Sequence, residues 1–366
     1  MSGKKYVRAA KIAVALGMGV GAGAQIPRQN QPDRMLTAEV RTEVIDTMVK
    51  KLNENYIFPE TAKKMETAIR GRVKNHEYDT VTSSQTFAEL LTTHLQEVSK
   101  DKHLRVRYSY DAMPVRSNDQ PTAQEIEQFR SYNRIMNYGF EKVERLAGNV
   151  GYIDLRGFLD PDSGGDTVAA AMALLTNTDA MIIDLRQNGG GSPEMVQLIC
   201  SYFFEGDPVH LNDLYYRPTD STHQYWTLPH VPGKRYVGKD VYILTSHRTF
   251  SGAEEFSYNM KNLKRATIVG ETTGGGAHPG GMERLNDHFG VFLPVGRAIN
   301  PITKTNWEGT GVAPDVACPA DQALKTAHIA AMKRALASAT DTDRKANIQG
   351  VIDTTQKELD VLKAAH

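Results

Sequence analysis

Residues 244–256 read LTSHRTFSGAEEF and mark the point where a strand gives way to a helix. A short apolar run at residues 241–244 precedes the break. Apolar residues follow it at three- and four-residue spacing, which predicts a helix that begins at Ser251 and buries one side: Ala253, Phe256, Met260 and Leu263. Unpaired N–H groups at a helix start stabilise an anion, so Ser251 is either a simple N-cap or a nucleophile. This stretch alone favours the cap.

The same alternation extends over residues 149–318. Strand-like runs at 150–155, 180–185, 241–244 and 266–269 alternate with helical patterns at 167–175, 193–204 and 251–262. Strands that alternate with helices predict an α/β domain with a mostly parallel sheet covered by helices. A polar and aromatic insert at residues 206–232 interrupts the pattern, and its segments 211–216 and 225–228 are expected to form a hairpin.

Helical segments flank this domain on both sides. Residues 36–100 contain three short amphipathic patterns and are expected to form a small helical domain. Residues 101–148 form a connecting segment, in which His103 lies at a junction between a helix and a strand, a place where functional side chains are often displayed. Residues 319–366 form a helical extension that is split near Asp341.

The N-terminus has the order of a secretory signal peptide. The basic residues Lys4, Lys5, Arg8 and Lys11 precede an uncharged stretch at residues 12–24 that ends in small residues. Residues 1–24 are therefore predicted to be a signal peptide, and the protein to be exported, either to the periplasm or outside the cell. The alternative is a cytosolic tail on a cytoplasmic protein. The stretch is too short for stable membrane insertion.

The composition excludes several function classes. Lys plus Arg and Asp plus Glu number 43 each, which gives no electrostatic reason to expect a nucleic-acid partner. Cys200 and Cys318 are far apart and lie outside any paired-cysteine motif, so neither a disulfide framework nor a zinc site is predicted. No cofactor and no metal are expected, and no oligomeric state is predicted.

Two glycine-rich loops and one acidic turn stand out as chemical motifs. Residues 184–193 read DLRQNGGGSP, and consecutive glycines let backbone N–H groups approach a ligand. The Walker lysine and the dinucleotide glycine spacing are both missing, so this loop suits a carbonyl oxyanion better than a nucleotide. A second glycine-rich loop lies at residues 270–281. Glu308 is followed by two glycines, and it is either an exposed turn acid or a partner for a catalytic histidine.

Together these motifs resemble one family. Residues 184–191, 249–256, 270–276 and 308–315 occur in an order and spacing similar to the C-terminal processing, or tail-specific, serine peptidases, and above all to the branch that includes the repeats of interphotoreceptor retinoid-binding protein. The resemblance covers roughly residues 36–316. It implies a crotonase-like and ClpP-like β-α superhelix in the catalytic domain. About fifty residues separate His103 from the first strand of that domain, too few for the PDZ domain that many members carry.

The resemblance also implies the roles of single residues. Ser251 would be the nucleophile, and the N–H of Gly252 together with that of Gly190 or Gly191 would form the oxyanion hole. Residues 274–276 are all glycine where the tail-specific branch has a Gly-Lys-Gly base motif, so a lysine base is not expected. The tricorn-like branch uses an upstream histidine and a downstream glutamate instead, and His103 and Glu308 match those roles by order.

The resulting prediction is a serine-type peptidase that hydrolyses peptides or unfolded proteins through an acyl-enzyme on Ser251. One alternative is a protein on the same fold that binds a hydrophobic small molecule such as a retinoid or a fatty acid. The aromatic insert would line its pocket, through Tyr215, Tyr216, Tyr225, Trp226 and Leu228. A peptide-binding protein with a decayed active site is the other. The presence of His103 and Glu308 together with Ser251 favours the enzyme.

Overall fold

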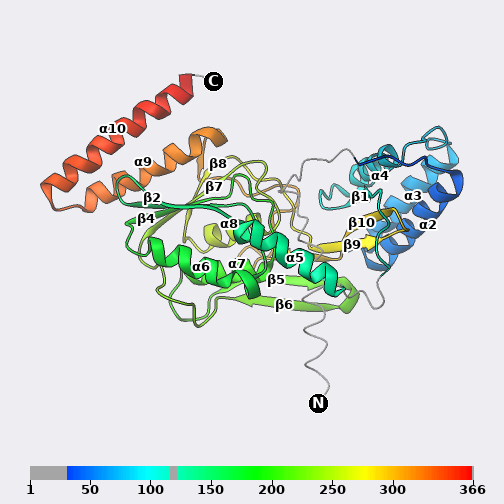
Figure 1. Cartoon of the computed structure of the whole chain (residues 1–366), viewed down its shortest axis with the longest axis horizontal. Coiled ribbons are helices and arrows are strands. Elements are labelled where there is room, and N and C mark those ends of the chain that lie inside the picture. Colours follow the sequence, from blue (N-terminus) through cyan, green and yellow to red (C-terminus); the bar gives the residue numbers. More distant parts are fainter. Residues whose placement is uncertain (1–30, 116–121, 365–366) are drawn as a thin grey trace, which may run out of the picture.

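A six-stranded sheet forms the centre of the larger part of the molecule (Figure 1). The computed structural model describes residues 31–115 and 122–364; the predicted signal peptide lies outside them. The strand order is β12-β8-β7-β4-β3-β2, and all neighbours are parallel except β2 and β3. The strands are β2 (Phe140–Leu146), β3 (Val150–Leu155), β4 (Ala180–Asp184), β7 (Asp240–Thr245), β8 (Thr267–Gly270) and β12 (Val316–Ala317). The predicted α/β class is therefore confirmed, and β2 extends the sheet into the segment that was predicted to be a connection.

Helices cover both faces of this sheet because alternate strand residues point to opposite sides. Ile183 belongs to one buried cluster, which also contains α6 (Pro161–Leu175), α7 (Pro193–Ser201) and α8 (Gly252–Asn262). Its neighbour Ile182 belongs to another, which contains α9 (Ala320–Ser338) and α10 (Thr342–Ala364). The predicted C-terminal helical extension, with its break near Asp341, is thus the second covering layer of the sheet.

The N-terminal helices do not form a purely helical domain. Helices α2 (Ala38–Asn55), α3 (Pro59–Lys74) and α4 (Ser84–Ser99) share one hydrophobic cluster with a three-stranded antiparallel sheet in the order β1-β10-β9. Strand β1 (Arg105–Tyr108) follows α4 directly, whereas β9 (Gly280–Arg284) and β10 (Phe289–Pro294) come from the region predicted to be catalytic. The helical domain expected at residues 36–100 is therefore completed by distant segments, which Figure 1 shows side by side at one end of the molecule.

The aromatic insert forms the predicted hairpin. Strand β5 (His210–Tyr216) pairs antiparallel with β6 (Ser221–Trp226), and β11 (Gly296–Ile299) joins β5 on its other edge. One further helix, α5 (Ala123–Ile135), precedes β2. Among the helices of the described residues, none is both long and apolar enough to cross a membrane.

Candidate active site

Ser251 lies at the turn between β7 and α8 in a conformation that L-residues rarely adopt. Its φ is 54° and its ψ is −121°, and a residue held in such a region costs about 1–3 kcal/mol unless its surroundings fix it. A hydrogen bond within the first helical turn stabilises this conformation, because the Ser251 N–H donates to Glu254 Oε2 at 2.9 Å. The half-buried Ser251 therefore lies at the start of a helix whose first turn is stabilised by its backbone N–H and does not depend on its hydroxyl group.

The first glycine loop touches this helix start. A Cβ on Gly190 would lie 2.7 Å from the Gly252 nitrogen and 2.8 Å from Ser251 Cβ, and one on Gly191 would lie 2.0 Å from the Phe158 carbonyl oxygen. Both glycines also have positive φ, at 105° and 141°. Only glycine lets this loop approach the serine so closely.

Asn188 decides which N–H groups remain available. This fully buried side chain donates to the Leu155 carbonyl at 2.9 Å and accepts from the Gly190 N–H at 2.8 Å. The Gly190 N–H is therefore already engaged, which favours Gly191 of the two glycines that were expected to supply the second oxyanion donor. The N–H groups of Gly191 and Gly252 have no acceptor among the described residues. A Cβ on Gly252 would lie 3.1 Å from the Gly191 nitrogen, so these two donors are neighbours.

Glu254 ties the second glycine loop to the same turn, a role that sequence reasoning missed. Its Oε1 accepts from Thr273 Oγ1 at 2.5 Å and from the Gly275 N–H at 2.6 Å, and its Oε2 accepts from the Gly276 N–H at 2.8 Å. Burial raises the pKa of Glu254 to about 7, although these hydrogen bonds act to lower it. The signal in the sequence was a Ser-x-x-Glu capping pattern that begins at Ser251.

His103 packs beside the serine turn. Its ring lies 4.5 Å from that of Phe250 and 5.8 Å from that of Phe292, measured between centroids. The ring also lies against the second glycine loop, since a Cβ on Gly276 would be 2.7 Å from His103 Cε1. Burial lowers the pKa of His103 to about 4, which keeps the imidazole neutral and able to accept a proton at neutral pH. The described residues show no direct hydrogen bond between His103 and Ser251.

The carboxylate nearest His103 belongs to Asp101, not to Glu308. Asp101 Oδ1 accepts from the His103 backbone N–H at 3.0 Å and lies 4.0 Å from His103 Nδ1, whereas its Oδ2 accepts from His278 Nδ1 at 2.8 Å. Glu308 accepts from the Ala277 N–H at 2.5 Å and lies 3.4 Å from His278 Nδ1. The expected direct pairing of Glu308 with His103 is thus replaced by a chain that runs through His278 and Asp101.

This buried cluster shifts the pKa of each member. Burial would lower the pKa of His278, but the hydrogen bond and charge of Asp101 raise it above its usual value. Burial would raise the pKa of Asp101, but His278 and His103 lower it. Burial and the Asp101 charge raise the pKa of Glu308 to about 7. Potential metal-ligating atoms of Asp101, His278 and Glu308 lie within 4.8 Å of one another, although hydrogen bonds and ion pairs already connect them.

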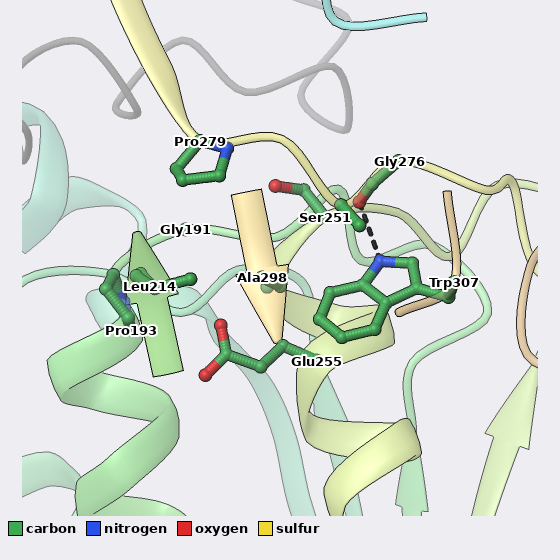
Figure 2. Close-up of a pocket in the computed structure, with 11 residues that line it drawn as sticks. Gly191, Pro193, Leu214, Ser251, Glu255, Gly276, Pro279, Ala298 and Trp307 are labelled. Atoms are coloured by element: carbon green, nitrogen blue, oxygen red, sulfur yellow. Dashed lines mark hydrogen bonds between the residues drawn. The ribbon is translucent and has the colours of Figure 1, made fainter. Parts of the chain in front are cut away.

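A pocket opens directly beside Ser251 (Figure 2). Its empty space measures about 310 Å³ when the open solvent at its mouth is counted, and its wall contains Gly191, Gly252 and Trp307. Trp307 donates from Nε1 to the Gly276 carbonyl at 2.7 Å, which holds the indole along one side. From the hairpin insert, the pocket is lined by Leu214 and not by the five residues on which the alternative of a hydrophobic ligand depends.

Comparisons with known proteins agree with this arrangement. A family model described as peptidase family S41 matches residues 149–318. A second model, described as the N-terminal domain of peptidase S41 in eukaryotic IRBP, matches residues 36–138. The chloroplastic carboxyl-terminal-processing peptidase 2 of Arabidopsis thaliana is 28% identical over 177 residues, which are 46% of this chain and 32% of that protein. The tail-specific protease of Haemophilus influenzae is 30% identical over 103 residues, 26% of this chain and 13% of that protein.

The chain therefore spans about a third or less of the length of these curated relatives. Among solved structures, a candidate peptidase from Parabacteroides merdae superposes with a TM-score of 0.51 at 20% identity, over 76% of this chain and 90% of that one. This structural similarity supports the fold described above from the order of the strands and helices.

Proposed function

Because the chain belongs to peptidase family S41, we propose that it is a serine peptidase that cleaves peptide bonds through an acyl-enzyme on Ser251. One observation carries the proposal: Ser251 lies beside two neighbouring N–H groups, those of Gly191 and Gly252, that are free to receive an oxyanion. Such donors act in a preorganised site, and removing one typically costs about 10²–10³ in kcat. A simple N-cap needs no such arrangement.

His103 serves as the general base in this proposal. The neutral imidazole takes the proton from Ser251 Oγ as the oxygen attacks the substrate carbonyl, and it then gives this proton to the leaving amine. The N–H groups of Gly191 and Gly252 stabilise the negative oxygen of the tetrahedral intermediate. Water then attacks the acyl-enzyme by the reverse sequence and releases the acid product. The proposal requires the His103 side chain to come within hydrogen-bond reach of Ser251 in the reacting complex, since apo sites are often looser than that complex.

The carboxylates support the base from a distance. Asp101, 4.0 Å from His103 Nδ1, stabilises the imidazolium that forms in the transition state. His278 holds Asp101 in place, and Glu308 acts on His278. In this scheme Glu308 is a positioning residue that acts through His278 and Asp101. The proposed substrate is a peptide or an unfolded protein chain, which the membership of a peptidase family supports.

Reaction with a fluorophosphonate probe tests the proposal directly. The wild-type protein should become labelled, and Ser251→Ala should abolish labelling and peptide hydrolysis. Ser221→Ala is the matched control, because this exposed serine on β6 lies outside the pocket and should leave both unchanged. His103→Ala should reduce the hydrolysis rate by several orders of magnitude. Folded wild-type protein that neither reacts with the probe nor cleaves unfolded protein substrates would contradict the proposal.

We also propose that the protein is exported, with cleavage after Ala24. The basic residues up to Lys11 and the uncharged stretch at residues 12–24 support this. N-terminal sequencing of the protein from its own cells should find Gln25 as the first residue. An intact start at residue 1 would contradict export by this route.

A further inference from the structure

Glu255 lies on the floor of the pocket beside Ser251. It follows Ser251 by four residues on α8, so the two side chains share one face of the helix, one turn apart. Figure 2 shows its carboxyl group extending from the helix toward Pro193 and Leu214, on the side away from Trp307. Sequence reasoning assigned this residue no role.

The pocket wall beside Glu255 is apolar, and the described residues place no counterion there. Pro193, Leu214 and Ala298 form the neighbouring wall, and Glu255 itself is only 5% exposed. The polar side chain that acts on its carboxyl group is the fully buried Asn212 on β5, an uncharged amide. A carboxylate is rarely left in such a place without a cation, because desolvation of its charge is costly.

The electrostatic environment of the floor is acidic. Among the described residues, Glu194 on α7 is the one charged group that acts on Glu255, and it is acidic as well. Glu194 has its own partners, since it accepts from Ser192 Oγ at 2.7 Å and from the Tyr225 hydroxyl at 3.1 Å. Burial, together with Glu194, raises the pKa of Glu255 to about 8, although Asn212 opposes the shift. The pocket lining thus contains one carboxyl group, that of Glu255, and no cation among the described residues, while Glu194 adds a second acidic group outside the lining.

We propose that this pocket receives the side chain of the substrate residue on the acyl side of the scissile bond, and that Glu255 selects lysine or arginine there. The proposal rests on the proposed serine peptidase function. One helical turn separates Ser251 from Glu255, or about 6 Å along the axis, which is comparable to the length of the lysine stem. The apolar wall packs against this stem, and the cationic head reaches the Glu255 carboxyl group and favours its ionised form.

The expected preference for lysine follows from a comparison with an uncharged side chain of the same length. A norleucine side chain has nearly the same length as lysine and fills the apolar wall equally well, but it offers Glu255 no cation and leaves its carboxyl group in the protonated form that the raised pKa favours at neutral pH. Buried interfacial charge pairs contribute a variable free energy, so we expect lysine to exceed norleucine in kcat/KM by about 10- to 100-fold. Glutamate at this position should be the poorest substrate, because it would place a second carboxylate beside Glu255.

A peptide series that differs only in the residue before the cleaved bond tests this inference. Lysine, arginine, norleucine, glutamine and glutamate would be compared by kcat/KM. Glu255→Gln keeps the shape of the side chain and removes its charge, so it should bring the lysine to norleucine ratio to about threefold or less while norleucine hydrolysis persists. Glu205→Gln is the matched control, since it removes the same charge from an exposed residue outside the pocket and should keep the preference.

The outcomes separate this inference from the function on which it rests. Cleavage with equal or better rates for norleucine or glutamine overturns the selection by Glu255 but leaves the serine peptidase intact. A lysine preference that survives Glu255→Gln unchanged also overturns it. If the folded protein cleaves none of the peptides and its Ser251 does not react with a fluorophosphonate, the proposed function itself fails.

Discussion

Replacing Gly276 with alanine should disable the enzyme although it substitutes no residue that is proposed to react. A Cβ on Gly276 would lie 2.2 Å from Phe250 Cζ and 2.7 Å from His103 Cε1. Ordinary contacts begin near 3.4 Å, so the Phe250 ring would have to retreat by about 1.2 Å and the His103 ring by about 0.7 Å. Both rings are largely buried, so the surrounding core must move with them.

The size of the effect follows from these displacements. A misplacement of about 1 Å in a catalytic group can cost about 10²-fold in rate, so kcat/KM should fall by roughly that factor or more. Overpacking a well-filled region typically costs about 1–3 kcal/mol, so the free energy of unfolding should fall by an amount in that range. The protein would then remain folded but lose most of its activity.

Kinetics and denaturation together test this prediction. Peptide hydrolysis and the rate of fluorophosphonate labelling measure the site, and urea denaturation measures stability. Gly281→Ala is the matched control, because a Cβ there has no atom within 4 Å and should change neither property strongly. A folded Gly276→Ala variant with the kcat/KM of the wild type would refute the reasoning that places the base against this loop.

Two further predictions concern protonation. Burial lowers the pKa of His103 to about 4, and a general base must be unprotonated to act. The kcat/KM of peptide hydrolysis should therefore stay nearly constant from pH 7 down to about pH 5 and fall only below pH 5. A fall in kcat/KM near pH 6.5, the usual pKa of histidine, would contradict the burial of His103 as the base. Asp101→Asn should lower the free energy of unfolding by breaking the buried pair with His278. The pair stabilises the fold only while Asp101 is ionised and His278 is protonated. The loss of unfolding free energy in the variant should therefore be largest between the ordinary pKa values of aspartate and histidine, 3.8 and 6.5, and should shrink as pH rises through the raised pKa of His278. Urea denaturation at about pH 5.5 and pH 9 measures the difference, and an equal deficit at both would count against a charged pair.

The site could be predicted in part because some of its features are local. Ser251 precedes an amphipathic helix, and a chain that leaves a buried strand for such a helix must place that residue at the helix start. Likewise, the run of glycines at residues 189–191 signals a close backbone approach. The partner of that approach, however, comes from sixty residues further along the chain, and its identity came from a family resemblance.

Other features of the site depend on segments that no local pattern connects. Asp101 and His278 are 177 residues apart in the chain, yet they share a hydrogen bond of 2.8 Å. Strand β1 beyond His103 is paired with β10, which lies just after the second glycine loop, and this pairing brings the two segments together. Alternation of apolar residues predicts a strand but does not name its partner, so neither His278 nor the role of Asp101 was expected.

The sequence by itself determined the α/β order, the helix start at Ser251 and the helical segments that flank the α/β region in the chain, because these follow from periodicity and from residue types a few positions apart. Only the tertiary structure decided that Asn188 engages the Gly190 N–H, that Asp101 lies nearer to His103 than Glu308 does, and that Glu255 faces an apolar pocket. Which hydrogen-bond donor is free and which carboxylate is buried are set by contacts between distant segments. Those contacts exist only once the sheet and its two helical layers have packed.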